Sequence, residues 1–410
     1  MRPWQTLPTH RSWLDAECRR LLGFGRHVVL PGGGAAYLDD DGVPDPSRGV
    51  QTWITARTVH VYSLGALLGV PGSAGVAAGA LAGLTGGLRD ARAGGWYHAL
   101  SEHGVPDTVA GKSCYDHAFV LLAASSATLA GIPGARELLD EASGVFLDRF
   151  WDEEAGRCVD EWDVSWSVVA PYRGLNANMH AVEAMLAVAD CLDDDSWRDR
   201  AARICAFVVT LAEENESRLP EHFDDGWGPQ PDLNRDRPDD PFKPYGATIG
   251  HGLEWARLLL QAEAALGERA PSGLASTASL LFDRAVEDGW ARDGAPGFVY
   301  TTDWAGVPVV RDRMHWVAAE AVGAADALHR RTGEARYADL YARWWDYVVT
   351  YLVDVDRGSW RHQLDASNVP ADGVWPGKPD LYHAVQATLL PRVPLGPSLA
   401  RAAHDGLVSA

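Results

Sequence analysis

The sequence is poor in cysteine, short of basic residues and without any long apolar run. Its five cysteines are widely spaced and form no C-x-x-C pair, which argues against a zinc knuckle or a disulfide framework. No run of about 18 apolar residues occurs, and the first twenty residues lack an apolar core, so we expect neither a membrane span nor a secretory leader. With 36 basic and 56 acidic residues, the formal net charge is -20, which disfavours nucleic acid and anionic membranes as partners. A cytoplasmic protein that acts on something small and neutral is expected.

Several catalytic signatures are missing as well. There is no G-x-S-x-G nucleophile elbow, no H-E-x-x-H zinc motif, and no G-x-G-x-x-G after a plausible strand. The glycine-rich segment "LPGGGAAY" lacks the Lys-Ser/Thr pair of a phosphate-binding loop, and a hairpin turn accounts for it. These absences leave the corresponding hydrolase, zinc-protease and nucleotide-binding chemistries without support.

What the sequence does contain is a three-part unit that recurs six times. Each unit begins with a long amphipathic helix, as predicted over 135–151 and 196–215, and continues through a turn segment rich in Gly and Asp. It ends in a small, apolar second helix that opens near a histidine. The six histidines are His60, His117, His180, His251, His315 and His383. Successive members lie 57 to 71 residues apart, which exceeds the period of about 34 to 47 residues in helical solenoids.

The period and the character of the two helices predict an all-α fold. Helices that are apolar nearly all round suit an inner layer that is buried on both sides, and charged, amphipathic helices suit an outer layer. Six such pairs can close into an (α/α)6 barrel of six inner and six outer helices with short hairpins between repeats. We expect residues 1–410 to form a single catalytic domain of this kind. The 17 tryptophans either pack between helices or line a cleft that stacks on a sugar.

In a closed ring, equivalent helix starts lie at one mouth, so the six histidines are expected to converge on one cavity. The positive end of the helix dipole would lower the pKa of a histidine there, and a neutral imidazole can accept a proton and return it. Glu254, one turn after His251, would orient that imidazole. A shared metal ion is the alternative, but the uneven registers of Glu183, Glu254, Glu320 and Asp116 argue against it. We predict neither a metal nor another cofactor.

Four segments resemble the N-acylglucosamine 2-epimerase superfamily, a group of (α/α)6-barrel enzymes that interconvert sugars at C1 and C2. They are "QTWITARTVHVYSL", "NANMHAVEAMLA", "GHGLEW" and "GKPDLYHAVQ", and the likeness extends over nearly the whole chain. The second and the fourth are most similar to the aldose–ketose isomerase branch. The resemblance implies an isomerase that interconverts D-mannose and D-fructose without a metal, through a cis-enediolate.

The resemblance also implies residue roles. Arg57 would contact the oxygens at the reacting end of the sugar, and His180 would lie beside O1 and O2. The implied catalytic residues are Arg57, His180, His251, Glu254 and His383. The expected substrate contacts are Tyr115, Asn176, Trp316, Trp375 and Gln386, where Gln386 repeats relative to His383 the spacing of Glu183 to His180. Whether His251 or His383 removes the C2 proton stays open.

Structural roles are the alternative for several of these residues. Arg57 could pair with a buried carboxylate, Tyr115 could belong to the core, and Asn176 with Asn178 could cap the following helix. The rival enzymes are a sugar 2-epimerase of the mannose, glucose or cellobiose type, a sulfoquinovose isomerase, and an inverting glycoside hydrolase, which needs two carboxylates about 6.5 to 9.5 Å apart. A non-catalytic sugar-binding module would have no use for the histidine set. The expected partner is a neutral monosaccharide, and the expected assembly is a monomer or a homodimer.

Overall fold

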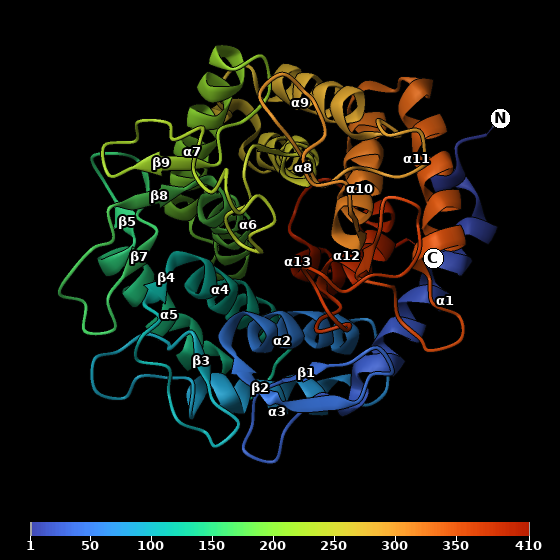
Figure 1. Cartoon of the computed structure of the whole chain (residues 1–410). Helices are drawn as coiled ribbons and strands as arrows, with labels where there is room; N and C mark the ends of the chain where they lie inside the picture. Colours follow the sequence, from blue (N-terminus) through green and yellow to red (C-terminus); the bar gives the residue numbers. More distant parts are fainter. Residues whose placement is uncertain (1, 410) are drawn as a thin grey trace.

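The computed structural model describes residues 2–409 and consists of two concentric layers of helices (Figure 1). The inner layer holds α2 (Thr52–Leu67), α4 (Cys114–Leu129), α6 (Leu175–Leu192), α8 (Ile249–Leu266), α10 (His315–Thr332) and α12 (Tyr382–Leu389). The outer layer holds α1 (Pro8–Phe24), α3 (Ser73–Thr85), α5 (Ala135–Arg149), α7 (Asp195–Glu214), α9 (Leu274–Gly289) and α11 (Ala335–Tyr347). Each inner helix contacts the next, and α12 contacts α2, so the ring is closed. The predicted (α/α)6 barrel is confirmed.

The two layers differ in how much of each helix is buried. The outer helix α7 buries a single stripe that includes Trp197, Ala201, Ile204 and Val208, whose spacing follows the helical repeat. The inner helix α4 is buried at nearly every position, including its alanines and serines. An inner helix faces the outer layer on one side and the barrel axis on the other, so it has no solvent-facing stripe. Small side chains allow six such helices to pack around a narrow axis.

Short antiparallel strands join the repeats at the N-terminal ends of the inner helices. The strand before an inner helix pairs with the hairpin of the next repeat: β2 with β3, β4 with β7, β8 with β9, β10 with β11, and β12 with β13. The strands are β1 (Ala36–Leu38), β2 (Pro44–Gln51), β3 (Ala99–Leu100), β4 (Lys112–Ser113), β5 (Trp151–Asp152), β6 (Arg157–Cys158), β7 (Glu161–Trp162), β8 (Tyr172–Gly174), β9 (His222–Asp224), β10 (Ala247–Thr248), β11 (Thr301–Thr302), β12 (Arg313–Met314) and β13 (Gln363–Leu364). The backbone N–H of Lys378 donates to Leu38 O at 3.0 Å and ties the last repeat to the first. The hairpins therefore form a belt that links neighbouring repeats around one mouth.

A common turn explains why each repeat carries Gly and Asp at the same place. The turn begins at an aspartate in five repeats and at Ser101 in the other, and the N–H of this residue donates to a carbonyl four or five residues later. The third residue after it has a positive φ in all six repeats: Gly42, Gly104, Trp166, Trp227, Gly306 and Asn368. Glycine adopts this left-handed conformation without strain, and asparagine tolerates it. The Gly- and Asp-rich segments of the sequence are these turns.

The C-terminal segment closes the other end of the barrel. α13 (Leu399–His404) contacts α2, α4 and α6. Short helical turns complete the chain: η1 (Trp4–Thr6), η2 (Gly25–His27), η3 (Gly267–Arg269), the π-helical η4 (Val348–Leu352) and η5 (Leu390–Arg392). Across residues 2–409, no helix combines the length and the apolar character that a bilayer crossing requires.

Candidate active site

A cavity opens among the N-terminal ends of the inner helices, and all six of these helices contribute to its lining. Its empty space, part of which is open to solvent, is about 620 Å³. The sequence-predicted site residues that line it are Arg57, Tyr115, Asn176, His180, His251, Glu254, Trp316, Trp375 and His383. Gln386 lies outside the lining, where its Nε2 donates to Glu183 Oε1 at 2.9 Å. From that position Gln386 supports Glu183, and its expected contact with substrate finds no support.

Only four of the six repeat histidines line the cavity, namely His180, His251, His315 and His383. His60 lies eight residues after the first residue of α2. At a rise of 1.5 Å per residue, it is about 12 Å along the helix axis from the start of α2. Its Nδ1 is 2.7 Å from Ser126 Oγ. His117 points away from the axis, because its Nε2 accepts the backbone N–H of Trp96 at 3.1 Å. The expectation that all six converge is therefore wrong for His60 and His117. On α2, Arg57 lines the cavity and His60 does not.

Arg57 is held between a carboxylate and aromatic rings. Its Nη1 donates to Asp380 Oδ2 at 3.2 Å, and its Nη2 donates to Tyr115 OH at 2.9 Å. The guanidinium carbon lies 4.3 Å from the ring centre of Phe119 and 4.7 Å from that of Tyr382. The alternative interpretation of Arg57 as the partner of a buried carboxylate is thus correct, and the residue lines the cavity as well. A cation fixed in this way is a preorganised donor for negative charge that develops on a bound oxygen.

Trp316 contacts two histidines that come from different helices. Its ring centre is 5.3 Å from that of His251 and 5.7 Å from that of His383. His251 belongs to the first turn of α8 and His383 to the first turn of α12, while Trp316 comes from α10, which contacts both helices. The two imidazoles are therefore near enough to act on one small molecule.

Each of these two imidazoles has a carboxylate beside Nδ1. His251 Nδ1 lies 3.0 Å from Glu221 Oε1, and His383 Nδ1 lies 3.0 Å from Glu320 Oε1. Burial lowers the pKa of His383 well below its ordinary value, and the nearby charge of Arg57 lowers it further. A neutral imidazole that donates Nδ1–H to a carboxylate keeps Nε2 as its proton acceptor. His383 is thus in the form that a general base requires.

Burial lowers the pKa of the histidines in the cavity and favours their neutral form. It lowers the pKa of His180 to about 4 and that of His315 to about 4. Transfer of an imidazolium out of water is unfavourable, so a buried histidine sheds its proton. His315 also stacks on His362, with ring centres 3.8 Å apart, and a positive charge on one would repel a positive charge on the other.

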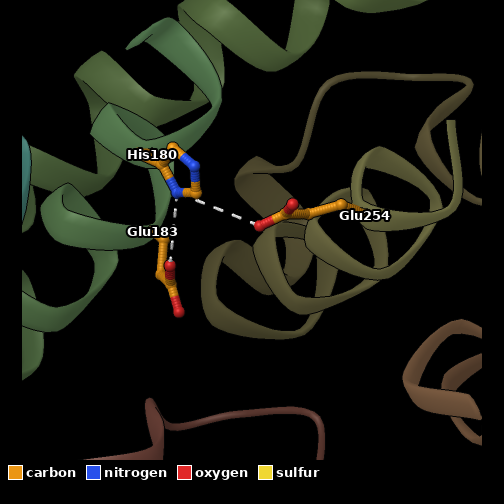
Figure 2. Close-up of side chains that lie close together, drawn as sticks. All are labelled: His180, Glu183 and Glu254. Carbon is orange, nitrogen blue, oxygen red and sulfur yellow. Dashed lines mark ion pairs between the residues drawn. The ribbon is translucent and has the colours of Figure 1, made fainter. Parts of the chain in front are cut away.

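Carboxylates from two helices face His180 (Figure 2). Its Nδ1 is 3.9 Å from Glu183 Oε2 of α6 and 3.9 Å from Glu254 Oε1 of α8, both too long for a hydrogen bond. Burial and the charge of Glu320 raise the pKa of Glu254 well above its ordinary value. Burial opposes charge on Glu183 too, but its contact with His180 and the charge of Arg257 hold the pKa of Glu183 below its ordinary value. These opposite shifts favour the neutral form of Glu254 and the charged form of Glu183.

Arg257 of α8 is fully buried among these carboxylates. Its Nε donates to Glu320 Oε2 at 2.8 Å, and its Nη2 donates to Glu254 Oε1 at 3.3 Å. Two groups of side chains bring potential metal-ligand atoms within 4.8 Å of one another: His180, Glu183 and Glu254, and Glu254, Glu320 and His383. In the second group the Arg257 guanidinium already donates to both carboxylates. It supplies the positive charge that a metal would otherwise bring, so we do not assign this second group as a metal site.

Aromatic and amide side chains complete the lining. The ring centre of Trp375 lies 6.0 Å from that of Trp53 and 5.6 Å from that of Phe242, which belongs to the long segment between β9 and β10. The two asparagines of "NANMH" differ in role. Asn178 donates to Gly174 O at 3.0 Å and is structural, whereas Asn176 lines the cavity. Apolar rings beside polar groups match the two kinds of surface that a sugar presents.

Sequence reasoning missed three residues that complete the site. Glu221 takes the place beside His251 that Glu254 was expected to fill, and it belongs to the segment just before β9. Asp380 stands three residues before His383 within a motif that had been singled out. Arg257 had a signal of its own, since an arginine inside an apolar helix must find buried partners.

The barrel and its cavity define a protein equipped for acid–base chemistry on a small polar molecule. The N-acylglucosamine 2-epimerase (GlcNAc 2-epimerase) family matches residues 33–387, and the chain belongs to this family. A D-mannose isomerase of Thermobifida fusca is 52% identical over 403 residues, which are 97% of this chain and 98% of that protein. A D-mannose isomerase of Pseudomonas cannabina pv. alisalensis is 47% identical over 404 residues, 97% of this chain and 96% of that protein. The crystal structure of a D-mannose isomerase superposes with a TM-score of 0.85 at 26% identity and covers 93% of this chain and 98% of that chain.

Proposed function

We propose that the chain is an aldose–ketose isomerase that interconverts D-mannose and D-fructose, with residues 1–410 acting as one catalytic domain. The observation that carries this proposal is the pair of imidazoles of His251 and His383, which contact one indole in one cavity and each place Nδ1 against a carboxylate. The choice of sugar is supported by the two relatives of nearly full length that bear the name D-mannose isomerase.

The proposed reaction moves a proton from C2 to C1 of the open-chain sugar. Ring opening exposes the aldehyde. A base then removes the C2 proton, and the electron pair of the C–H bond forms a C1–C2 double bond, which leaves negative charge on O1. A proton passes from O2 to O1, and delivery of a proton to C1 gives the ketose with a carbonyl at C2. Atoms and charge balance without an added oxidant or metal.

Each step has a candidate residue in the cavity. Arg57 is proposed to stabilise the enediolate oxygens, a contribution of about 3 kcal/mol for one preorganised donor. His180 is close to Arg57 because both contact Tyr115. The ring centre of Tyr115 is 5.2 Å from that of His180, and its hydroxyl accepts from Arg57 Nη2. His383, neutral and hydrogen-bonded through Nδ1 to Glu320, is proposed as the base at C2. His251 is then left for ring opening and for proton transfer between the oxygens.

The charges of the lining favour a neutral substrate. Among the described residues that line the cavity, Arg57 is the one permanent cation, and Asp380 already pairs with it. A sulfonate or phosphate on the sugar would meet no free positive charge there, which favours mannose over sulfoquinovose. The absence of C-x-x-C pairs and the net charge of -20 support a cytoplasmic setting and a monosaccharide, rather than nucleic acid, as the partner.

The carboxylates do not favour a glycoside hydrolase. Oxygens of Glu254 and Glu320 lie within 4.8 Å of each other, closer than the separation of about 6.5 to 9.5 Å that an inverting pair needs for a water molecule. Arg257 donates to both. Asp116, the other carboxylate considered, accepts from His98 Nδ1 at 2.9 Å and is not part of the cavity lining.

Incubation of D-mannose with the protein in D2O, followed by NMR, tests the proposal. Fructose that carries deuterium at C1 is the expected product. Glucose that carries deuterium at C2 as the main product would identify a 2-epimerase, and unchanged mannose would refute both activities.

The histidine roles need separate variants. His251→Ala and His383→Ala should each reduce kcat by three or more powers of ten while the circular dichroism spectrum stays unchanged. His117→Ala is the matched control, because His117 is as deeply buried but faces away from the cavity. It should keep activity within a few fold once folded. Near-normal activity of either cavity variant would overturn that assignment.

A further inference from the structure

Building on the isomerase activity proposed above, we infer that Arg257 is a positioning residue that holds Glu320 against Nδ1 of His383 as a hydrogen-bond acceptor and so fixes the proton-accepting tautomer of His383. Arg257 does not line the catalytic cavity. It acts on the reaction through Glu320 and His383, which separate it from the substrate.

The geometry is a chain of two contacts through one carboxylate. Glu320 Oε1 lies 3.0 Å from His383 Nδ1, and Glu320 Oε2 accepts from Arg257 Nε at 2.8 Å. The exposed fractions of Arg257 and Glu320 are 1% each, so water does not compete for either contact. Arg257 is held in place from its other side as well, because its Nη1 donates to Gln261 Oε1 at 3.0 Å.

Arg257 is the positively charged residue within a cluster of three glutamates. It faces Glu254 of its own helix, Glu183 of α6 and Glu320 of α10. It donates to two of them, through Nη2 to Glu254 Oε1 at 3.3 Å and through Nε to Glu320 Oε2 at 2.8 Å. Glu183 has further donors in Tyr382 OH and in the amide of Gln386. Glu320, by contrast, depends on Arg257 for positive charge.

Among the described residues, no cation other than Arg257 contacts the glutamate that pairs with this imidazole. The titratable groups that face His383 are Arg57 of α2, His180 of α6, His315 of α10, and His362 and Asp380 of the segment before α12. Arg57 is paired with Asp380 at 3.2 Å. Burial lowers the pKa of both His180 and His315 to about 4, so these two are neutral. Within residues 2–409, Arg257 is therefore the cation in contact with Glu320.

Removal of the guanidinium would change the tautomer of His383. Without the guanidinium, the buried carboxyl groups of Glu254 and Glu320 have no counter-charge. Such a pair takes up a proton, because an unpaired ion is costly in a medium of low dielectric constant. A protonated Glu320 can donate its O–H to His383 Nδ1, and the imidazole proton then resides on Nε2. The nitrogen available to the sugar becomes a donor, and the C2 proton loses its acceptor. In a serine protease, a wrong histidine tautomer reduces kcat by about 10⁴-fold.

The test uses Arg257→Gln, Arg257→Lys and a matched control. We expect Arg257→Gln to lose about 10³- to 10⁴-fold in kcat near neutral pH, with KM within a few fold of the wild-type value. The acidic limb of its kcat profile should move to higher pH, because a buried carboxyl group that has lost its counter-charge gives up its proton only at higher pH. Arg257→Lys keeps the charge and should recover most of the activity.

Arg313→Gln is the control for lost stability alone. Arg313 is equally buried and donates to Asp293 Oδ1 at 2.6 Å, away from the cavity. It should destabilise the protein without moving the pH profile. A wild-type pH profile in Arg257→Gln, an equal loss of kcat in Arg313→Gln, or no recovery in Arg257→Lys would each overturn the inference.

A spectroscopic readout separates this inference from the proposed function. Histidine ¹⁵N NMR, assigned with His383→Asn, should show His383 protonated at Nδ1 in the wild type and at Nε2 in Arg257→Gln. An unchanged tautomer would overturn the role of Arg257 even if the wild type isomerises mannose. Should Arg257→Gln not fold, Glu320→Gln removes the same charge from the other partner, and undiminished kcat in that variant would also overturn it. A wild type inactive on mannose would refute the proposed function and leave the tautomer test intact.

Discussion

The ion pair of Arg57 and Asp380 allows stability and catalysis to be separated. The two side chains are 6% and 7% exposed, and Nη1 and Oδ2 are 3.2 Å apart. With an effective dielectric constant near 20, Coulomb's law gives an attraction of about 5 kcal/mol at this distance. Desolvation offsets most of that gain. The measurable effect is therefore the penalty for leaving one partner charged and alone, about 3 to 5 kcal/mol in buried pairs.

Three variants follow from this argument: Arg57→Met, Asp380→Asn and the double variant. Each single change should lower the free energy of unfolding by about 3 to 5 kcal/mol, because a buried charge loses its partner. The double variant should regain most of that stability. Its activity should not return, since the donor to the enediolate oxygens is still missing. A loss of about 3 kcal/mol in transition-state stabilisation corresponds to roughly 100-fold in kcat/KM.

Urea unfolding followed by tryptophan fluorescence gives the stabilities, and the rate of fructose formation gives the activities. The coupling free energy from the four proteins isolates the pair. Asp380→Asn retains the guanidinium and should remain much more active than Arg57→Met. If the double variant recovered activity together with stability, Arg57 would be a structural counterion only, and its assignment to the enediolate would be refuted.

Three further outcomes are expected. The charge of Asp116 and the hydrogen bond to it raise the pKa of His98 to about 9. This pKa in the folded protein lies above the value of about 6.5 in the unfolded chain. The His98–Asp116 pair therefore stabilises the fold fully below pH 6.5 and loses its effect as the pH rises through 9. The urea midpoint should fall across that window in the wild type but not in His98→Gln. Activity should survive EDTA, because Arg257 supplies the cluster's positive charge, and a loss reversed by a divalent ion would contradict this. Trp316→Leu should raise KM by about tenfold through lost ring contact with the sugar, and an unchanged KM would argue against that contact.

The fold was predictable because the repeat carries it. Six turns with an aspartate or serine at the start and a left-handed residue three positions later mark six hairpins, and each hairpin is followed by an apolar helix. The depth of a residue along its helix was not predictable from spacing alone. α2 begins eight residues before His60, whereas α12 begins one residue before His383. The same histidine spacing therefore places one imidazole deep in the barrel and the other at the mouth.

Pairing of charges across helices was also beyond the sequence. Arg57 and Asp380 are 323 residues apart, and His383 and Glu320 are 63 apart. Neither separation predicts a contact until the ring is closed and α12 lies between α10 and α2. With the barrel given, however, an arginine in the apolar helix α8 and a glutamate in its neighbour α10 do predict a buried pair, and the structure contains it.

Burial in the inner layer explains both the neutral form of His383 and the presence of a cation beside its partner Glu320. An imidazole enclosed by helices on all sides loses its proton, which keeps His383 in the neutral form that the proposed base requires. The same enclosure makes any bare carboxylate unstable, so the glutamate that orients His383 needs a cation of its own. A second lysine or arginine at that depth would need a further anion. One guanidinium that donates to both Glu320 and Glu254 brings positive charge to this cluster with a single buried cation and leaves Nε2 of His383 free.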